Sequence, residues 1–122
     1  MKQLLFLLLM SSVSSKSFSQ QFAGLWYSSD STRIYKFQEE SPGKWNAIIQ
    51  SSTRKNDRVG YKVIRELVYN KNKKRYEGYL YSVKDDQPAF MKINMDNPER
   101  LRLKLNRMFL FGITIDWYKL KG

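Results

Sequence analysis

The last third of this chain alternates between apolar and polar side chains, and this pattern allows few folds. Residues 89–95 read Ala-Phe-Met-Lys-Ile-Asn-Met, and residues 101–105 read Leu-Arg-Leu-Lys-Leu. Successive side chains of a β-strand point to opposite faces, so a period of two gives each segment one apolar face and one wet face. The turn-forming residues 96–99, Asp-Asn-Pro-Glu, lie between the two segments and predict a hairpin.

Joining the apolar faces of this hairpin determines its register. Three apolar pairs are expected: Met95 with Leu101, Ile93 with Leu103, and Met91 with Leu105. The same register sets Lys92 opposite Lys104 and Asn94 opposite Arg102 on the wet face.

The rest of the chain consists of further short strand-like runs separated by polar turns. Strands are expected near residues 24–27, 33–37, 45–49, 76–81 and 109–120. Residues 61–69 fit either a helical stripe or a strand, and their aromatic and β-branched content favours the strand. Gly78, inside a strand, predicts a bulge or a close backbone approach. Eight or nine hairpin-linked strands without a crossover helix predict an all-β, antiparallel up-and-down barrel, closed by pairing residues 24–29 with the last strand.

The N-terminus has the order of a secretory signal peptide. Lys2 is followed by the apolar run Leu4–Met10 and then by a serine-rich stretch, so cleavage is expected after Ser19. The apolar run is too short for a transmembrane anchor, which needs roughly 20 residues. Residues 20–122 then form one exported domain. Because the chain has no cysteine, it has neither a lipoprotein anchor nor disulfides, which favours a bacterial periplasmic or secreted protein.

The composition argues against an enzyme. Without histidine or cysteine, the chain has no Ser-His-Asp site, no Cys-His site and none of the common zinc ligand sets. The adjacent carboxylates Glu39-Glu40 and Asp85-Asp86 point apart on a strand or lie solvated in a loop, so neither pair suits acid–base chemistry or metal binding. We therefore expect no catalytic residue, no metal and no cofactor.

Several short motifs carry a resemblance to a known family. They are Gly24-Leu25-Trp26, Gly60, Val63-Ile64, Tyr76-Glu77-Gly78, Leu101–Leu105, and Phe111–Thr114 with Trp117. Their order resembles the bacterial domain of unknown function family 2147, small exported proteins with a lipocalin-like β-barrel. The resemblance implies that Trp26 plugs the closed end of such a barrel. It brings no activity with it.

The sequence departs from that family at three places. Ser82-Val83 stand where the family usually has Asp-Pro, Asn106 where it has glycine, and Ile113 where it has arginine. The implied fold survives these changes, whereas a site built from those residues would not.

The first functional hypothesis is a binding module for a small apolar or amphipathic ligand held in the barrel mouth. The candidate pocket residues are Trp26, Tyr35, Phe37, Trp45, Met91, Leu103 and Trp117. The alternative left open is that these large side chains simply fill the interior.

The second hypothesis uses the positive charge. The full chain carries a formal net charge of +11, which favours anionic partners. Lys92, Arg102 and Lys104 then form an outer basic face for anionic lipid or glycan in a cell envelope, with Lys71, Lys73, Lys74 and Arg75 as the next candidates. Nucleic acid is a less available partner there. Asp116 is expected to make a surface ion pair on the same face.

Overall fold

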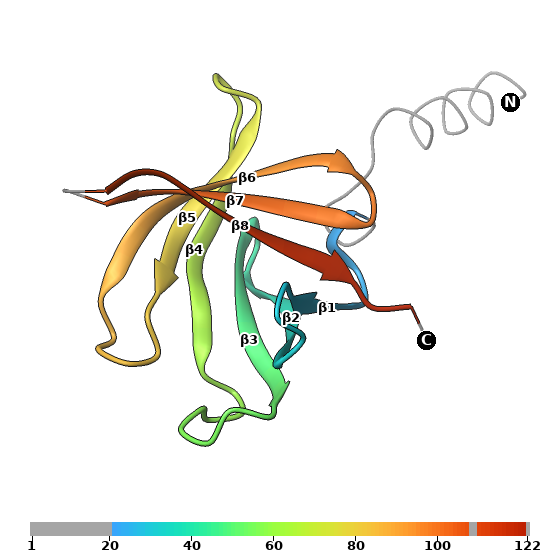
Figure 1. The fold of residues 1–122 in the computed structure, drawn as a ribbon. Coiled ribbons are helices and arrows are strands. Elements are labelled where there is room, and N and C mark those ends of the chain that lie inside the picture. Colours follow the sequence, from blue (N-terminus) through green and yellow to red (C-terminus); the bar gives the residue numbers. More distant parts are fainter. Residues whose placement is uncertain (1–20, 108–109, 122) are drawn as a thin grey trace, which may run out of the picture.

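The chain forms a closed barrel of eight antiparallel strands in up-and-down order (Figure 1). The structure, a computed structural model, describes residues 21–107 and 110–121, so the predicted signal peptide lies outside the described residues. The strands are β1 (Leu25–Ser28), β2 (Arg33–Ser41), β3 (Lys44–Ser52), β4 (Lys62–Asn70), β5 (Arg75–Tyr81), β6 (Pro88–Asn97), β7 (Arg100–Arg107) and β8 (Leu110–Lys119). The predicted fold class is confirmed.

The barrel closes through its shortest strand. β1 pairs with β2 on one side and with β8 on the other, where Trp26 lies opposite Lys119 and Ser28 lies opposite Trp117. This is the closure expected from the sequence. It leaves no strand of the described barrel without neighbours on both sides.

The register of the β6–β7 hairpin follows the alternation in the sequence. Met91 pairs with Leu105 and Ile93 with Leu103, and all four side chains are buried. Each fully buried side chain of this kind contributes roughly 1.5–3 kcal/mol, which holds the register. The third predicted pair, Met95 with Leu101, does not form. An irregularity follows Asn94, and the ladder resumes at Asn97 and Arg100.

The ambiguous segment is a strand, but an irregular one. In β4, Glu66 takes a left-handed backbone conformation with φ of 55°, and the pairing with β5 shifts between Arg65 and Val68. Gly78 of β5 faces this bulge. A Cβ at Gly78 would lie 3.1 Å from both the Arg65 carbonyl oxygen and the Leu67 Cα. The close backbone approach predicted from Gly78 is confirmed.

Large apolar side chains fill the barrel interior. The rings of Tyr35 and Trp117 are stacked, with centroids 3.7 Å apart. Trp26, Met91 and Leu103 are fully or almost fully buried in the same core. The core therefore holds the fold by close packing, without disulfides.

One polar side chain lies where the alternation predicts an exposed one. Asn46 of β3 is 2% exposed, and its side-chain nitrogen donates a hydrogen bond to Glu40. The cause is an irregularity in the β3–β4 pairing around Ala47, which breaks the period of two. Trp45, next to it, is half-buried and packs against the core from its edge.

Candidate functional site

A hollow of about 330 Å³ lies at one end of the barrel, which we call the mouth. Three described loops surround this end: residues 29–32, 53–61 and 82–87. The hollow is lined by apolar and aromatic side chains and by a few polar ones: Arg33, Tyr35, Arg54, Val63, Leu80, Tyr81, Ser82, Val83, Lys84, Ala89, Leu105, Ile115 and Trp117. The mouth thus combines apolar lining with three cations.

A bidentate ion pair joins β2 to the loop after β3. Arg33 Nε lies 2.6 Å from Asp57 Oδ2, and Arg33 Nη2 lies 2.8 Å from Asp57 Oδ1. The Ser52 hydroxyl donates a third hydrogen bond to Asp57 at 2.7 Å. The Asp57 side chain is 4% exposed. Its hydrogen bonds with Arg33 hold the pKa of this carboxyl below its usual value.

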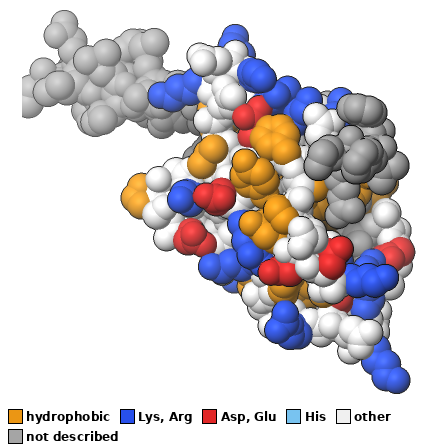
Figure 2. Space-filling model, turned by 90° about the vertical axis from the view of Figure 1, so that its left-hand side faces the viewer, with side chains coloured by type: hydrophobic (Ala, Val, Ile, Leu, Met, Phe, Trp, Pro, Cys, Tyr) orange, Lys and Arg blue, Asp and Glu red, His pale blue; other side chains and the backbone are white. Residues whose placement is uncertain are grey.

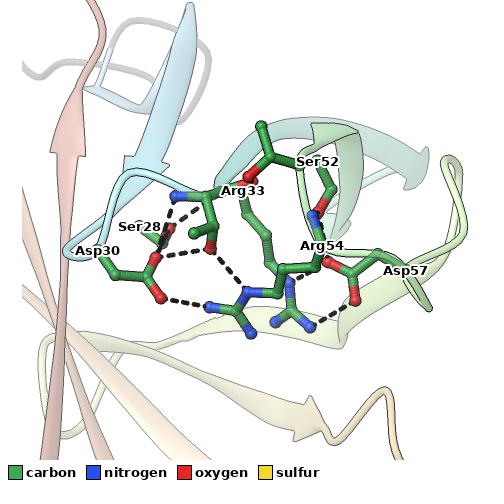
Figure 3. A network of polar contacts seen from close by, with 8 residues as sticks. Ser28, Asp30, Arg33, Ser52, Arg54 and Asp57 are labelled. Carbon is green, nitrogen blue, oxygen red and sulfur yellow. Dashed lines mark hydrogen bonds and ion pairs between the residues drawn. The ribbon is translucent and has the colours of Figure 1, made fainter.

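A second carboxylate organises the neighbouring loop. Asp30 Oδ1 accepts hydrogen bonds from the Ser28 hydroxyl at 2.7 Å and from both the backbone N–H and the hydroxyl of Thr32, at 3.0 and 2.7 Å. Arg54 Nη2 reaches its other oxygen at 2.8 Å. These bonds, those from Thr32 first, lower the pKa of Asp30. Figure 3 shows Arg33 and Arg54 between the two carboxylates, so that the two loops are joined into one network.

The floor of the mouth contains a buried phenol. Tyr35 is 4% exposed, and burial raises the pKa of its hydroxyl, an effect that the neighbouring Arg33 partly offsets. Because the phenol stays protonated at neutral pH, it can act as a hydrogen-bond donor there. The floor is therefore an aromatic stack that also carries a polar atom.

The third loop is held on the other side of the mouth. The Tyr61 hydroxyl donates to Asp86 and lies 3.2 Å from the Ser82 carbonyl oxygen. Arg65 Nη2 lies 3.2 Å from Asp86, and its guanidinium carbon lies 3.8 Å from the centroid of the Tyr81 ring. Burial, followed by the hydrogen bond with Asp86, raises the pKa of Tyr61 to about 12.

The structure divides the predicted pocket residues into two groups. Tyr35 and Trp117 line the mouth. Trp26, Phe37, Met91 and Leu103 are buried in the core, and Trp45 packs against its edge. These five lie outside the lining of the mouth because packed rings and aliphatic chains occupy the interior below it.

The sequence reasoning missed the cations Arg33, Arg54 and Lys84. They lie in or beside loops, where the alternation carries no information about facing. The polar residues next to them in the sequence could have indicated an organised loop at this end of the barrel. Ser-Ser-Asp-Ser-Thr at residues 28–32 is rich in side chains that hydrogen-bond nearby backbone.

The predicted basic face has the expected register but carries acids as well. Lys92 lies opposite Lys104 on β7 and opposite Glu77 on β5. Arg102 Nε lies 3.2 Å from Asp116 Oδ1, which confirms the predicted surface ion pair. On the face shown in Figure 2, Lys and Arg side chains are likewise interspersed with Asp and Glu. This mixing weakens the long-range field of the three predicted cations.

The next predicted cations lie at the β4–β5 turn. Lys71, Lys73 and Lys74 are exposed in that turn, and Figure 1 shows the hairpin projecting from the barrel. Arg75 is instead paired with Glu77 at 2.7 Å.

Within residues 21–107 and 110–121, no three acidic side chains lie close enough together to hold a metal ion. No helix among the same residues has the length and apolar character needed to cross a bilayer. In comparisons with known proteins, no family model, no curated protein and no solved structure matches this chain.

Proposed function

We propose that this protein is an exported, non-enzymatic binding module that holds one small amphipathic ligand with an anionic group in the barrel mouth. The observation that carries the proposal is the 330 Å³ hollow, which has an aromatic floor and three cations in its lining. Its volume lies at the lower end of the range for ligand pockets, roughly 300–1,000 Å³. A single ring or one short alkyl chain suits this size.

The apolar part of the ligand enters against the strand walls. Val63, Leu105 and Ile115 come from three different strands and present aliphatic surface to the hollow. Burying apolar ligand surface there contributes about 25 cal/mol per Å². The stacked rings of Tyr35 and Trp117 limit how deep the ligand goes.

The three cations differ in how far they are already engaged. Arg33 directs two nitrogens at Asp57. Arg54 is paired with Asp30 but is 38% exposed and has further N–H donors. Lys84 makes no ion pair with an acid of the described residues. An anionic group at the mouth would therefore meet Lys84 first and Arg54 second.

The ionisable groups near the mouth support binding over acid–base catalysis. The pKa of Asp57 is lowered and that of Tyr35 is raised, so each stays in one protonation state around neutral pH. The alternative, anion binding at the outer face of Lys92, Arg102 and Lys104, has weaker support because Asp116 already pairs with Arg102.

Titration with decanoate and decanol, followed by calorimetry or NMR, tests the proposal. Val83→Trp puts an indole into the mouth, and we expect it to weaken decanoate binding at least tenfold. Val59→Trp is the matched control, because Val59 is 71% exposed on a neighbouring loop and does not line the hollow. Equal affinities of the two variants would contradict the proposal.

A charge variant separates the two parts of the ligand. Lys84→Gln should weaken decanoate binding severalfold and leave decanol binding unchanged, because decanol has no charge to lose. Lys55→Gln is the control, since Lys55 is exposed on loop 53–61 outside the lining. If both lysine variants bind decanoate like the parent, the anionic part of the proposal fails.

A further inference from the structure

A second and larger hollow, of about 830 Å³, lies on the outer surface of the barrel. We call it the outer groove. Its lining includes two tyrosines, Tyr27 and Tyr118, the aliphatic Ile34 and Leu120, three cations, and the acid Glu99. It is separate from the mouth, and no residue lines both hollows.

The strand register builds the floor of this groove as one row. Arg100 of β7 lies opposite Tyr118 of β8, Tyr118 opposite Tyr27 of β1, and Tyr27 opposite Ile34 of β2. Trp117, the neighbour of Tyr118, is buried inside the barrel, so the row faces outwards. The centroids of the Tyr27 and Tyr118 rings lie 5.6 Å apart, with 31° between their planes. Two partly exposed rings thus stand side by side next to an arginine.

The three cations of the outer groove differ in whether they already contact an acid or a ring. Lys121 Nζ lies 2.7 Å from a Glu99 carboxylate oxygen, and Lys119 Nζ lies 5.6 Å from the centroid of the Trp26 ring. Arg100 makes no ion pair with an acid of the described residues. Its planar guanidinium can hold a carboxylate with two parallel hydrogen bonds.

We propose that the outer groove binds an acidic oligosaccharide, with Tyr27 and Tyr118 against the C–H face of a sugar ring and Arg100 paired with a carboxylate of that sugar. A pyranose has one apolar face that suits the negative face of an aromatic ring, while its hydroxyls stay in water. The groove is open and also contains polar Ser31 and Asn97, so a ligand that stays partly hydrated fits it better than an alkyl chain does.

The experiment compares tetragalacturonic acid with the neutral maltotetraose by NMR titration at low and physiological salt. The acidic sugar should bind at least tenfold more tightly, and the difference should shrink as salt rises. Equal binding of both sugars, or no binding of the acidic one, would overturn the proposal. Binding of tetragalacturonic acid that decanoate displaces would also overturn it, because the ligand would then sit in the mouth.

Two pairs of variants locate the site. Tyr118→Ala should lower the affinity for the acidic sugar about tenfold. Tyr79→Ala is the control and should leave this affinity unchanged, because Tyr79 is also an outer-face tyrosine, beside the ring of Phe90, but does not line the groove. Arg100→Gln should cause a similar loss, whereas Arg102→Gln on the same strand should not.

A melting curve for each variant confirms that the fold is intact. If Tyr118→Ala is unstable, Arg100→Gln decides, because Arg100 lies at the barrel surface. Unchanged sugar binding in both Tyr118→Ala and Arg100→Gln would reject the oligosaccharide as the ligand. So would a second result, in which the protein binds anionic phospholipid vesicles but not the sugar, and Arg100→Gln abolishes the vesicle binding. Val83→Trp, which tests the mouth, should leave sugar binding unchanged, so the two proposals fail separately.

Discussion

The two ends of this barrel are built from different interactions. At the end opposite the mouth, which we call the closed end, the centroid of the Phe22 ring lies 5.2 Å from the ring centroids of both Phe37 and Tyr76. The Phe22 carbonyl oxygen also accepts a 3.2 Å hydrogen bond from Trp26 Nε1. At the mouth, carboxylates and guanidinium groups join the loops, led by the pair of Arg33 and Asp57. One end is closed by packed rings and the other is framed by polar contacts.

This difference explains where the mouth hollow lies. Aromatic side chains pack the barrel interior at the closed end. Polar loops hold each other through directional bonds across the rim and leave the space between them open. Stability is therefore expected to depend mainly on the closed end, and ligand binding on the mouth.

The largest loss of stability is expected at the closed end. Trp26→Ala should lower the free energy of unfolding by about 3–5 kcal/mol, because Trp26 is fully buried and its removal leaves a cavity. Urea unfolding measures the change. Trp26→Phe, which keeps most of the packing, should cost clearly less. A loss below about 1 kcal/mol for Trp26→Ala would show that the closed end does not carry the core.

A smaller loss is expected at the mouth. Asp57→Asn removes the charge that Arg33 and Ser52 contact, and it should lower the free energy of unfolding by about 2 kcal/mol. Asp85→Asn is the control, since Asp85 is exposed in another loop at the same end. If Asp57→Asn destabilises the protein more than Trp26→Ala does, the division between the two ends is wrong.

Acid should act on the mouth through the same carboxylate. The pKa of Asp57 in the folded state lies below its ordinary value of 3.8, because of hydrogen bonds from Arg33 first of all. The contribution of Asp57 to the stability of the folded state is therefore present at pH values above the ordinary pKa. It is lost as the pH falls below that value and through the pKa of the folded state. Urea unfolding at pH 6, 5, 4 and 3 should show that the free energy of unfolding falls less with acid in Asp57→Asn than in the parent. Parallel curves would contradict this assignment.

The smallest effect concerns the far side of the mouth. Tyr61→Phe removes the hydroxyl that donates to Asp86 and should cost less than about 1 kcal/mol. Hydrogen bonding from Tyr61 is the largest cause of the lowered pKa of Asp86, so this pKa should rise towards its usual value in the variant. An NMR titration of Asp86 measures the rise, with Tyr79→Phe as control. An unchanged pKa would show that the hydroxyl does not hold loop 82–87.

Much of the barrel follows from local pattern. Alternation in β6 and β7 predicts both which faces are buried and how Ile93 meets Leu103, because side chains of a strand point alternately to opposite faces. The pattern fails where the backbone is irregular. Asn46 is buried, and Met95 does not pair with Leu101, because bulges shift the period of two. No short run of residues in the sequence predicts these two bulges.

The candidate site was less predictable than the fold. Aromatic residues in the sequence suggested a lined cavity, but they carry no information about how rings pack against each other. In the structure, Tyr35 and Trp117 stack and form a floor, while Trp26 and Phe37 fill the space towards the closed end. The cations around the mouth come from loops, whose conformation depends on partners far along the chain.

The sequence is enough to predict the all-β class, the closing of the barrel from first strand to last, and the lack of histidine and cysteine chemistry, because each of these depends on residue type or on a period of two. By contrast, the folded structure is needed to find the pairing of Arg33 with Asp57, 24 residues away, the hollow between the loops, and the row from Arg100 to Ile34. These features join segments that meet only once the sheet has curled. Side-chain direction along a strand is a local property, whereas a cavity or an ion pair between loops depends on the whole closed barrel.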